Sequence, residues 1–356
     1  MYFLRSVLLL LLLLPGLAPV SWACAICAPA DAAGTLRQRL RAADVVVLAA
    51  PTVANAFTAQ HLIKGGWPQG PIRLPQGAQE SLTAPPLVLL YRNGTADWQS
   101  AGPLAHHHAD WARRLVALTD ATDLTPARWT SRIASFLPEL ESLEPLVAQA
   151  AYEEIASAPY AAMRAAAPRL NPAQLVRWLD TPALAARRPL YALLLGFAGN
   201  QVSADWLQQR MAGLRSTGDG STLSAMLAAW LELRGPEGVA WVERQYLSNP
   251  LAQEAGVSAA LLALSVHGGD GQRVGRSRVV QAYRYFVAQT TPWPGLVASD
   301  LGNWERWEFG PLFADWLASG KPQAFASRYA MVFFLMRSPR PEARTALESL
   351  RAAGMI

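Results

Sequence analysis

The sequence predicts a mainly α-helical protein in which an α-solenoid, residues 105–356, follows a small β-rich domain, residues 24–104. Two observations predict this fold class. Up to about residue 104, apolar residues fall in short β-branched runs bounded by Gly and Pro, and beyond it they recur with a period of about 3.6. The second observation is that, after residue 104, the connections between helical segments are short and rich in Gly, Pro and Asn. Amphipathic helices joined in this way are typical of stacked helical pairs.

Short apolar runs predict the strands of the β-rich domain, because β-branched residues favour extended structure. The runs cover residues 44–49, 57–63, 72–74 and 86–91, after a short helix at 36–43. Asn93-Gly94 follows the last run. This dipeptide suits a two-residue type I′ turn, in which both central residues take positive φ. We therefore predict a hairpin whose second strand covers residues 96–99.

Capping residues followed by proline mark several helix starts, at Thr125-Pro126, Asn171-Pro172 and Thr181-Pro182. A capping oxygen satisfies a free backbone amide, and proline at the first helical position has no amide to satisfy. The predicted helices cover residues 127–136, 144–157, 173–179, 183–196, 204–212, 221–233, 237–247, 253–266, 277–289, 309–318, 325–336 and 342–353.

The composition fits a large folded core and argues against a polyanionic partner. Apolar residues make up 52% of the chain and charged residues 16%, a balance that excludes wholesale disorder. The net charge of +5 comes from arginines spread along the chain beside a similar number of acids. Nucleic-acid-binding proteins gather basic residues on one face or in runs, so we expect no nucleic-acid partner.

Residues 1–23 have the organisation of a secretory signal peptide. Arg5 supplies a positive charge, residues 7–14 are all apolar, and Ser21 and Ala23 are small residues suited to cleavage before Cys24. A second option, after residues 23–25 (ACA), would cut before Ile26 and separate the two cysteines. The apolar run is shorter than the roughly 20 residues that cross a bilayer. We therefore predict an exported protein, periplasmic or secreted.

Cys24 and Cys27 are the two cysteines of the chain and form a C-x-x-C motif. With no other cysteine, the fold cannot depend on a disulfide framework. Three interpretations stay open. The pair forms a local disulfide or is split by cleavage; it serves as a redox or metal-binding thiol pair; or Cys24 is lipidated and tethers a lipoprotein to a membrane.

The β-rich domain resembles a known family of small barrels. After the cysteine motif come residues 43–47 (ADVVV), residues 62–65 (LIKG) and residues 72–74 (IRL). In this order they resemble the Greek-key barrel of tissue-inhibitor-of-metalloproteinase-like and netrin-like modules, whose motif is C-x-C with further cysteines. The resemblance implies an OB-like barrel over residues 27–104.

The helical part carries a second resemblance. Residues 150–160 (AAYEEIASAPY), 188–196 (RPLYALLLG) and 300–307 (DLGNWERW) are similar to segments of uncharacterised exported bacterial proteins with HEAT-like repeats. The resemblance implies HEAT-like helical repeats over residues 105–356 and an exported location. It implies no activity.

His106, His107 and His108 form the most concentrated polar cluster. Neighbouring histidines can share a metal ion, and His61 could join them. The alternative is a solvated linker leading into a helix that begins at Ala109.

Three further clusters each have a functional and a structural interpretation. A glycine-rich loop at residues 268–273 suits an anion or a flexible connection. A basic stretch with aromatics at residues 273–286 suits a polyanion or membrane surface, or an ordinary solvated face. Acids and tryptophans at residues 300–308 suit a sugar, or packing between helices.

The sequence predicts an exported scaffold that binds a protein or peptide, because solenoids present long surfaces for such partners. The alternative function is a periplasmic thiol-redox or metal-binding protein that uses Cys24, Cys27 and the three histidines at 106–108. No catalytic triad or dyad has a local signature, so the sequence names no catalytic residue and favours a protein that is not an enzyme. Apart from that metal we expect no cofactor, and a membrane contact only through lipidated Cys24.

Overall fold

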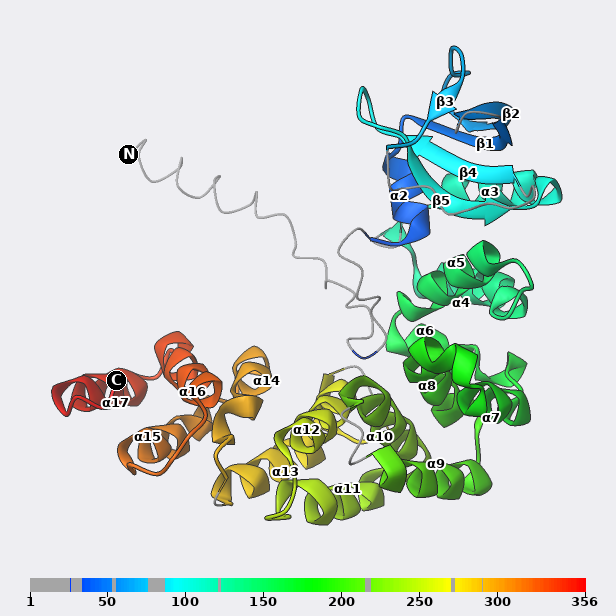
Figure 1. Cartoon of the computed structure of the whole chain (residues 1–356). Coiled ribbons are helices and arrows are strands. Elements are labelled where there is room, and N and C mark those ends of the chain that lie inside the picture. The colour runs from blue at the N-terminus through cyan, green and yellow to red at the C-terminus, as the bar shows by residue number, and fades with distance from the viewer. Residues whose placement is uncertain are drawn as a thin grey trace, which may run out of the picture.

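The computed structural model describes residue 26 and residues 34–52, 56–75, 87–120, 123–214, 219–269, 273–289 and 291–356. The chain is mainly helical, with a small curled antiparallel sheet near its N-terminal end, and the predicted class is confirmed at this level. Figure 1 shows the sheet at one end of an arc of helices that finishes with α17 (Pro341–Ala352).

The described residues form a five-stranded antiparallel sheet with the order β3-β2-β1-β4-β5. Its strands are β1 (Val45–Thr52), β2 (Ala56–Lys64), β3 (Ile72–Arg73), β4 (Leu87–Arg92) and β5 (Gln99–Leu104). β1 is central, with β2 on one side and β4 on the other. The four strands predicted from apolar runs are therefore present with small changes of boundary.

Both faces of the sheet are covered, which explains why β1 reads as a continuous apolar run. Val46 and Leu48 point into the main hydrophobic core, which also contains residues of α2 (Leu36–Ala42) and α3 (Ala109–Ala117). Val47 and Ala49 point into a second, smaller cluster on the other face. The curl of the sheet encloses that second cluster.

The predicted two-residue turn at residues 93–94 is wrong. β5 begins only at Gln99, so the connection covers residues 93–98. Trp98 explains the longer connection, because its buried ring packs into the smaller cluster of the sheet. Arg92 lies over that ring at 4.9 Å from the ring centroid. Packing of one tryptophan therefore outweighs the local preference of Asn-Gly for a tight turn.

The helices after the sheet follow the predicted pattern closely. They are α4 (Pro126–Phe136), α5 (Pro145–Ala156), α6 (Tyr160–Ala165), α7 (Pro172–Asp180), α8 (Arg188–Ala198), α9 (Gln201–Leu214), α10 (Gly220–Arg234), α11 (Pro236–Val242), α12 (Glu254–Gly269), α13 (Arg276–Ala288), α14 (Ala298–Asn303), α15 (Gly310–Ala318), α16 (Phe325–Arg337) and α17.

Two of the three predicted proline-marked starts begin α-helices. The Thr125 side chain accepts a hydrogen bond from the Arg128 N–H, and Asn171 Oδ1 accepts from the Ala173 and Gln174 N–H groups. These bonds satisfy amides that have no partner within the helix.

The third start, predicted for a helix at 183–196, is displaced. Residues Pro182–Arg187 form 3₁₀ structure in which Leu184 has φ −100° and ψ 15°, and α8 begins at Arg188. Pro189 lies in the first turn of α8. Because proline has no N–H to continue a preceding helix, it favours a new start at this position.

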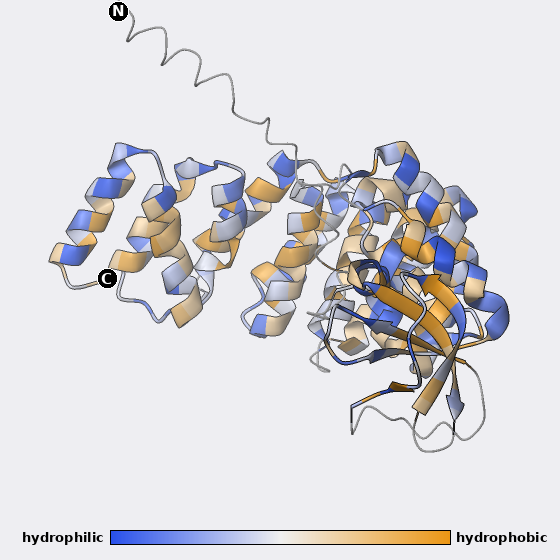
Figure 2. Ribbon diagram, turned by 90° about the horizontal axis from the view of Figure 1, so that it is seen from above, coloured by the Kyte–Doolittle hydropathy of each residue, from blue (hydrophilic) through white to orange (hydrophobic). Residues whose placement is uncertain are grey.

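The helices from α6 to α13 lie in two layers. α6, α8, α10 and α12 contact one another in that order, and α7, α9, α11 and α13 pack beside them. In Figure 1 the first set lies toward the inside of the arc and the second set toward the outside. In Figure 2 the sheet strands are strongly hydrophobic, whereas the C-terminal helices have hydrophilic and hydrophobic sides. None of the described helices is long and apolar enough to cross a membrane.

α8 and α10 are unusual for helices of an inner layer. Every residue from 189 to 196 in α8 and from 222 to 231 in α10 is buried. A helix that is apolar all round must be covered all round. Both helices are therefore covered on all sides, and Ile26 is one of the residues in the core that they share.

Candidate binding site on the inner face

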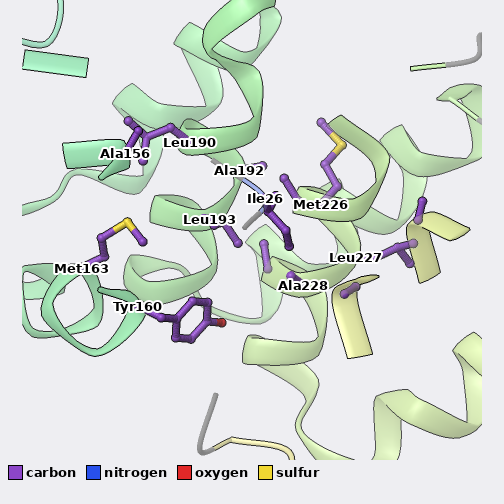
Figure 3. Close-up of a cluster of buried hydrophobic side chains, with 14 of the residues drawn as sticks. Ile26, Ala156, Tyr160, Met163, Leu190, Ala192, Leu193, Met226, Leu227 and Ala228 are labelled. Atoms are coloured by element: carbon purple, nitrogen blue, oxygen red, sulfur yellow. The ribbon is translucent and has the colours of Figure 1, made fainter. Parts of the chain in front are cut away.

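Ile26 lies on the inside of the arc, far along the chain from the helices that it contacts. Its side chain is only 7% exposed and belongs to the main hydrophobic core. In Figure 3 its side chain lies between α8 and α10, near Leu193 and Ala228. We call the surface of α8 and α10 around Ile26, which includes Leu193 and Ala228, the inner trough.

Small residues let α8 and α10 approach closely beneath the trough. A Cβ atom added to Gly196 of α8 would lie 2.6 Å from the Cα of Ala229 in α10. Ala192 and Ala228 are also buried on these two helices. These short side chains border the position that the Ile26 side chain occupies.

An ion pair connects α6 and α10 on the same side of the molecule. Arg164 donates two hydrogen bonds of 2.7 Å to the Glu232 carboxylate, and Tyr160 Oη donates a third of 3.1 Å. Burial acts to lower the pKa of Arg164, but the hydrogen bonds and charge of Glu232 outweigh it and leave that pKa raised. The Phe197 ring meets Tyr160 edge-on, with 4.7 Å between centroids.

His267 of α12 lies beneath Tyr160, with 6.0 Å between their ring centroids. The side chain is 1% exposed, and its Nε2 donates to the Ala228 carbonyl oxygen at 3.0 Å. Within the described residues its Nδ1 has no hydrogen-bond partner. A second proton on this ring would thus be buried without an acceptor. Burial accordingly lowers the pKa of His267, while the Glu232 charge opposes the shift.

The chemistry of this arrangement suits binding better than catalysis. Glu232 is engaged by Arg164 and Tyr160, and the Nδ1 atom of His267, though without a partner among the described residues, belongs to a side chain that is only 1% exposed. A general base needs a free pair of electrons directed at a substrate proton in a cleft. Here the apolar trough offers surface area, and the charged groups beside it stabilise one another.

The structure places the predicted metal ligands on a short exposed turn. His106, His107 and His108 form a 3₁₀ helix, in which successive side chains point about 120° apart. The centroids of the His106 and His107 rings are 5.7 Å apart, and the His108 ring meets Trp111 edge-on. In the part of the chain that the structure describes, no group of three or more His, Cys, Asp or Glu could hold a metal ion. The metal hypothesis for these histidines stays a prediction.

Cys24 and Cys27 lie outside the described residues, as do residues 1–23. The thiol, lipidation and signal-peptide hypotheses therefore also stay predictions.

The predicted glycine-rich loop begins within a helix. Gly268 belongs to the last turn of α12, and a Cβ atom there would lie 2.4 Å from the Trp304 ring. Residues 270–272 lie outside the described range. Arg276 bonds the Gly268 carbonyl oxygen at 2.7 Å and lies over the Trp304 ring. These contacts are those of helix packing.

Two arginines of the predicted basic stretch are likewise occupied within the chain. Arg278 donates two hydrogen bonds to Glu243, and Arg284 lies over the Phe309 ring at 4.6 Å. The Arg278 guanidinium is therefore paired within the chain, whereas Arg284 packs on a ring but stays exposed.

The predicted acidic and aromatic cluster is also a packing site. Tyr283 Oη donates to Asp300 at 2.6 Å, and Trp304 stacks on Tyr283 with 5.7 Å between centroids. Burial raises the pKa of Asp300, although hydrogen bonds from Tyr283 and Ser265 oppose the shift. The structural interpretation fits this cluster better than a sugar site.

A buried ionic network joins α2 to the helical array, and the sequence analysis missed it. Arg37 bonds Glu154 at 2.7 Å and Asp120 at 3.1 Å, and Arg132 bonds Glu154 at 3.3 Å. The Leu36 N–H donates to the Glu153 carboxylate at 2.6 Å. The one signal in the sequence was a Glu-Glu pair within an apolar stretch of α5.

No family model, no curated protein and no solved structure matches this chain. The site is therefore interpreted from its own geometry alone.

Proposed function

We propose that the chain is an exported binding scaffold that holds a protein or peptide partner. The observation that carries the proposal is a row of exposed apolar side chains along α16. Phe325, Tyr329, Phe333 and Met336 are 85, 64, 48 and 60% exposed. Spacings of three and four residues put them on one side of the helix. A contiguous exposed apolar patch is typical of a protein-binding surface.

Aromatic stacking within the row supports a preformed surface. The Tyr329 and Phe333 rings are nearly parallel, with 6.4 Å between centroids, and Arg337 lies over Phe333 at 5.8 Å. Tyrosine, phenylalanine and arginine are enriched where proteins bind one another. Aromatic side chains bury much area with few rotatable bonds, and arginine stacks on their rings.

The architecture supports the same proposal at a coarser level. Alternating helices in two layers along an arc are what a HEAT-like α-solenoid would have, and the curled sheet fits an OB-like module. A binding role taken from architecture alone is analogy. The signal-peptide pattern of residues 1–23 supports export to the periplasm or medium.

Site-specific crosslinking tests the proposal. A photoreactive amino acid at position 329 of the full chain, produced in its native host, should give one discrete adduct that mass spectrometry identifies. Phe333→Ser should abolish that adduct, because it removes the neighbouring ring of the row while leaving the buried face of α16 intact.

Leu251 provides the matched control, since it is 87% exposed but lies outside the row. The same photoreactive group at position 251 should give no such adduct. If positions 251 and 329 give the same products, α16 has no special role and the proposed function fails.

A further inference from the structure

We propose that the inner trough between α8 and α10 is a docking site for an aliphatic side chain, and that its resident ligand is this chain's own segment centred on Ile26. The contact is autoinhibitory, because an occupied trough is closed to any other apolar segment. The proposal concerns a different surface from the row on α16 and does not depend on it.

The burial of the two helices identifies the surface. α8 and α10 belong to the inner layer, yet residues 189–196 and 222–231 expose no face. Helices of an inner layer ordinarily keep one polar side toward solvent. These two instead have an alanine-rich and leucine-rich inner side, which is stable in water only when another apolar group covers it.

Ile26 shows what the trough accepts. The side chain is branched, aliphatic and 7% exposed, and Figure 3 shows it near Leu193 and Ala228. No charged side chain of α8 lies between residues 189 and 198. The nearest ion pair, Arg164 with Glu232, is internally satisfied. Recognition is therefore by shape and apolar area, and a charged side chain at position 26 would be rejected.

The docking is intramolecular because the connection to the rest of the fold is short. Gly34 begins the next described segment, and α2 is fixed to α5 by the bonds from Leu36 and Arg37. A connection of a few residues gives an effective concentration in the millimolar range. Burial of one isoleucine stabilises the docked state by about 1.5–3 kcal/mol, so the short connection makes occupancy of the trough much greater than it would be for the same segment as a free peptide.

The first experiment measures protease access in the full chain. Elastase cleavage between residues 26 and 34, followed by intact-mass spectrometry, should be about tenfold or more faster in Ile26→Asp than in the original chain. Leu143→Asp is the matched control, because Leu143 is fully exposed and its replacement should leave the rate unchanged. Circular dichroism verifies that each variant is folded, and Ile26→Ala replaces Ile26→Asp if the latter unfolds the array. Equal rates in the original chain and the folded variant would overturn the proposal.

The second experiment tests the trough itself. A labelled peptide with the sequence of residues 22–30, with serine in place of both cysteines, is titrated into the full-length Ile26→Asp chain. It should bind this chain at least about tenfold more tightly than the original chain, in which the trough is occupied. A peptide with aspartate in place of its isoleucine should bind the variant about tenfold more weakly. Equal binding by both peptides would contradict the proposal.

Light scattering distinguishes docking within one chain from docking into a second copy of the chain. If the Ile26 segment docks into a second copy, the original chain is a dimer that Ile26→Asp converts to a monomer, and the intramolecular assignment is wrong. Crosslinking at position 329 provides the independent readout for the proposed function. If position 329 gives no adduct that position 251 lacks, while Ile26→Asp still raises protease access, the proposed function fails and the trough assignment stands.

Discussion

Gly196 is a residue at which α8 and α10 approach each other closely. With hydrogen in place of a side chain, the α8 backbone approaches Ala229 to a distance that no Cβ atom would permit. We predict that Gly196→Ala lowers the free energy of unfolding by about 1–3 kcal/mol, because the two buried helices must separate or strain. Chemical denaturation followed by circular dichroism at 222 nm measures the change.

Gly213 is the matched control for that substitution. It lies in α9, and an added Cβ would meet nothing within 4 Å. Gly213→Ala should therefore raise stability by about 0.5–1 kcal/mol, through the better helix propensity of alanine. If Gly196→Ala and Gly213→Ala change the free energy of unfolding in the same direction, the close approach of α8 and α10 does not depend on the glycine at position 196.

His267 predicts a pH dependence of stability. Burial holds its pKa in the folded chain below the ordinary 6.5 of an unfolded histidine, with Arg164 acting in the same direction and Glu232 against it. Below about pH 6.5 the unfolded chain therefore binds a proton that the folded chain does not. Stability is complete above that pH and falls as the pH decreases, by up to about 1.4 kcal/mol per unit. Denaturant titrations between about pH 7 and pH 5 measure the slope.

Two variants isolate that dependence from the titration of other groups. His267→Gln keeps a donor for the Ala228 carbonyl oxygen and should flatten the slope over this range. His106→Gln replaces an exposed histidine and should leave the slope as it is. An unchanged slope in His267→Gln would show that another group carries the pH dependence.

Among the elements, those determined by local pattern were predictable. The strands at residues 44–49 and 86–91 and the helix at 325–336 follow from apolar periodicity, and the structure has them within a few residues. The connection between β4 and β5 was not predictable from local pattern, because burial of Trp98 determines its length. The short helix α6 was missed for a different reason. It has only six residues, too few to show a periodicity.

The candidate site was less predictable than the elements, because its contacts join distant parts of the sequence. Ile26 stands between two cysteines and draws no attention as a core residue. Arg164, Glu232 and His267 come from three helices, and only their packing brings them together. By contrast, the three consecutive histidines at 106–108 were conspicuous in the sequence but lie on an exposed turn.

The network between α2 and α5 makes a prediction at the scale of elements. Arg37 and Glu154 are 3% and 2% exposed, and Arg132 shares the carboxylate. Burial lowers the pKa of Arg132 even though Glu154 opposes the shift. We predict that Arg37→Met destabilises the fold by about 3–5 kcal/mol, because it leaves a buried carboxylate with half its partners. Thermal unfolding measures the loss.

Arg210→Met is the comparison for that substitution. Arg210 is paired with Asp180 at 3.3 Å on the surface, where an ion pair contributes about 0–1 kcal/mol. A loss of similar size in the two variants would mean that burial of the network between α2 and α5 adds nothing.

For the whole molecule, one continuous core runs from the sheet into the helices. Leu48 and Leu89 of the sheet belong to the same cluster as Trp111 of α3 and Leu146 of α5. α3 lies against β2, and Arg113 donates to the Leu62 carbonyl oxygen. A sheet face that packs on helices is unstable in water without them.

The sequence boundary near residue 105 therefore divides a packed unit. We predict that a fragment of residues 34–104 does not fold cooperatively, because it lacks α3 and α5 and exposes the side of β1 that carries Leu48. A fragment of residues 34–166, which adds α3 to α6 and the Arg37–Glu154 bond, should show a single unfolding transition. Amide dispersion in nuclear magnetic resonance spectra and calorimetry distinguish the two. A cooperative transition in the shorter fragment would establish the sheet as an independent domain. The contacts between the sheet and the helices would then not be needed for the sheet to fold.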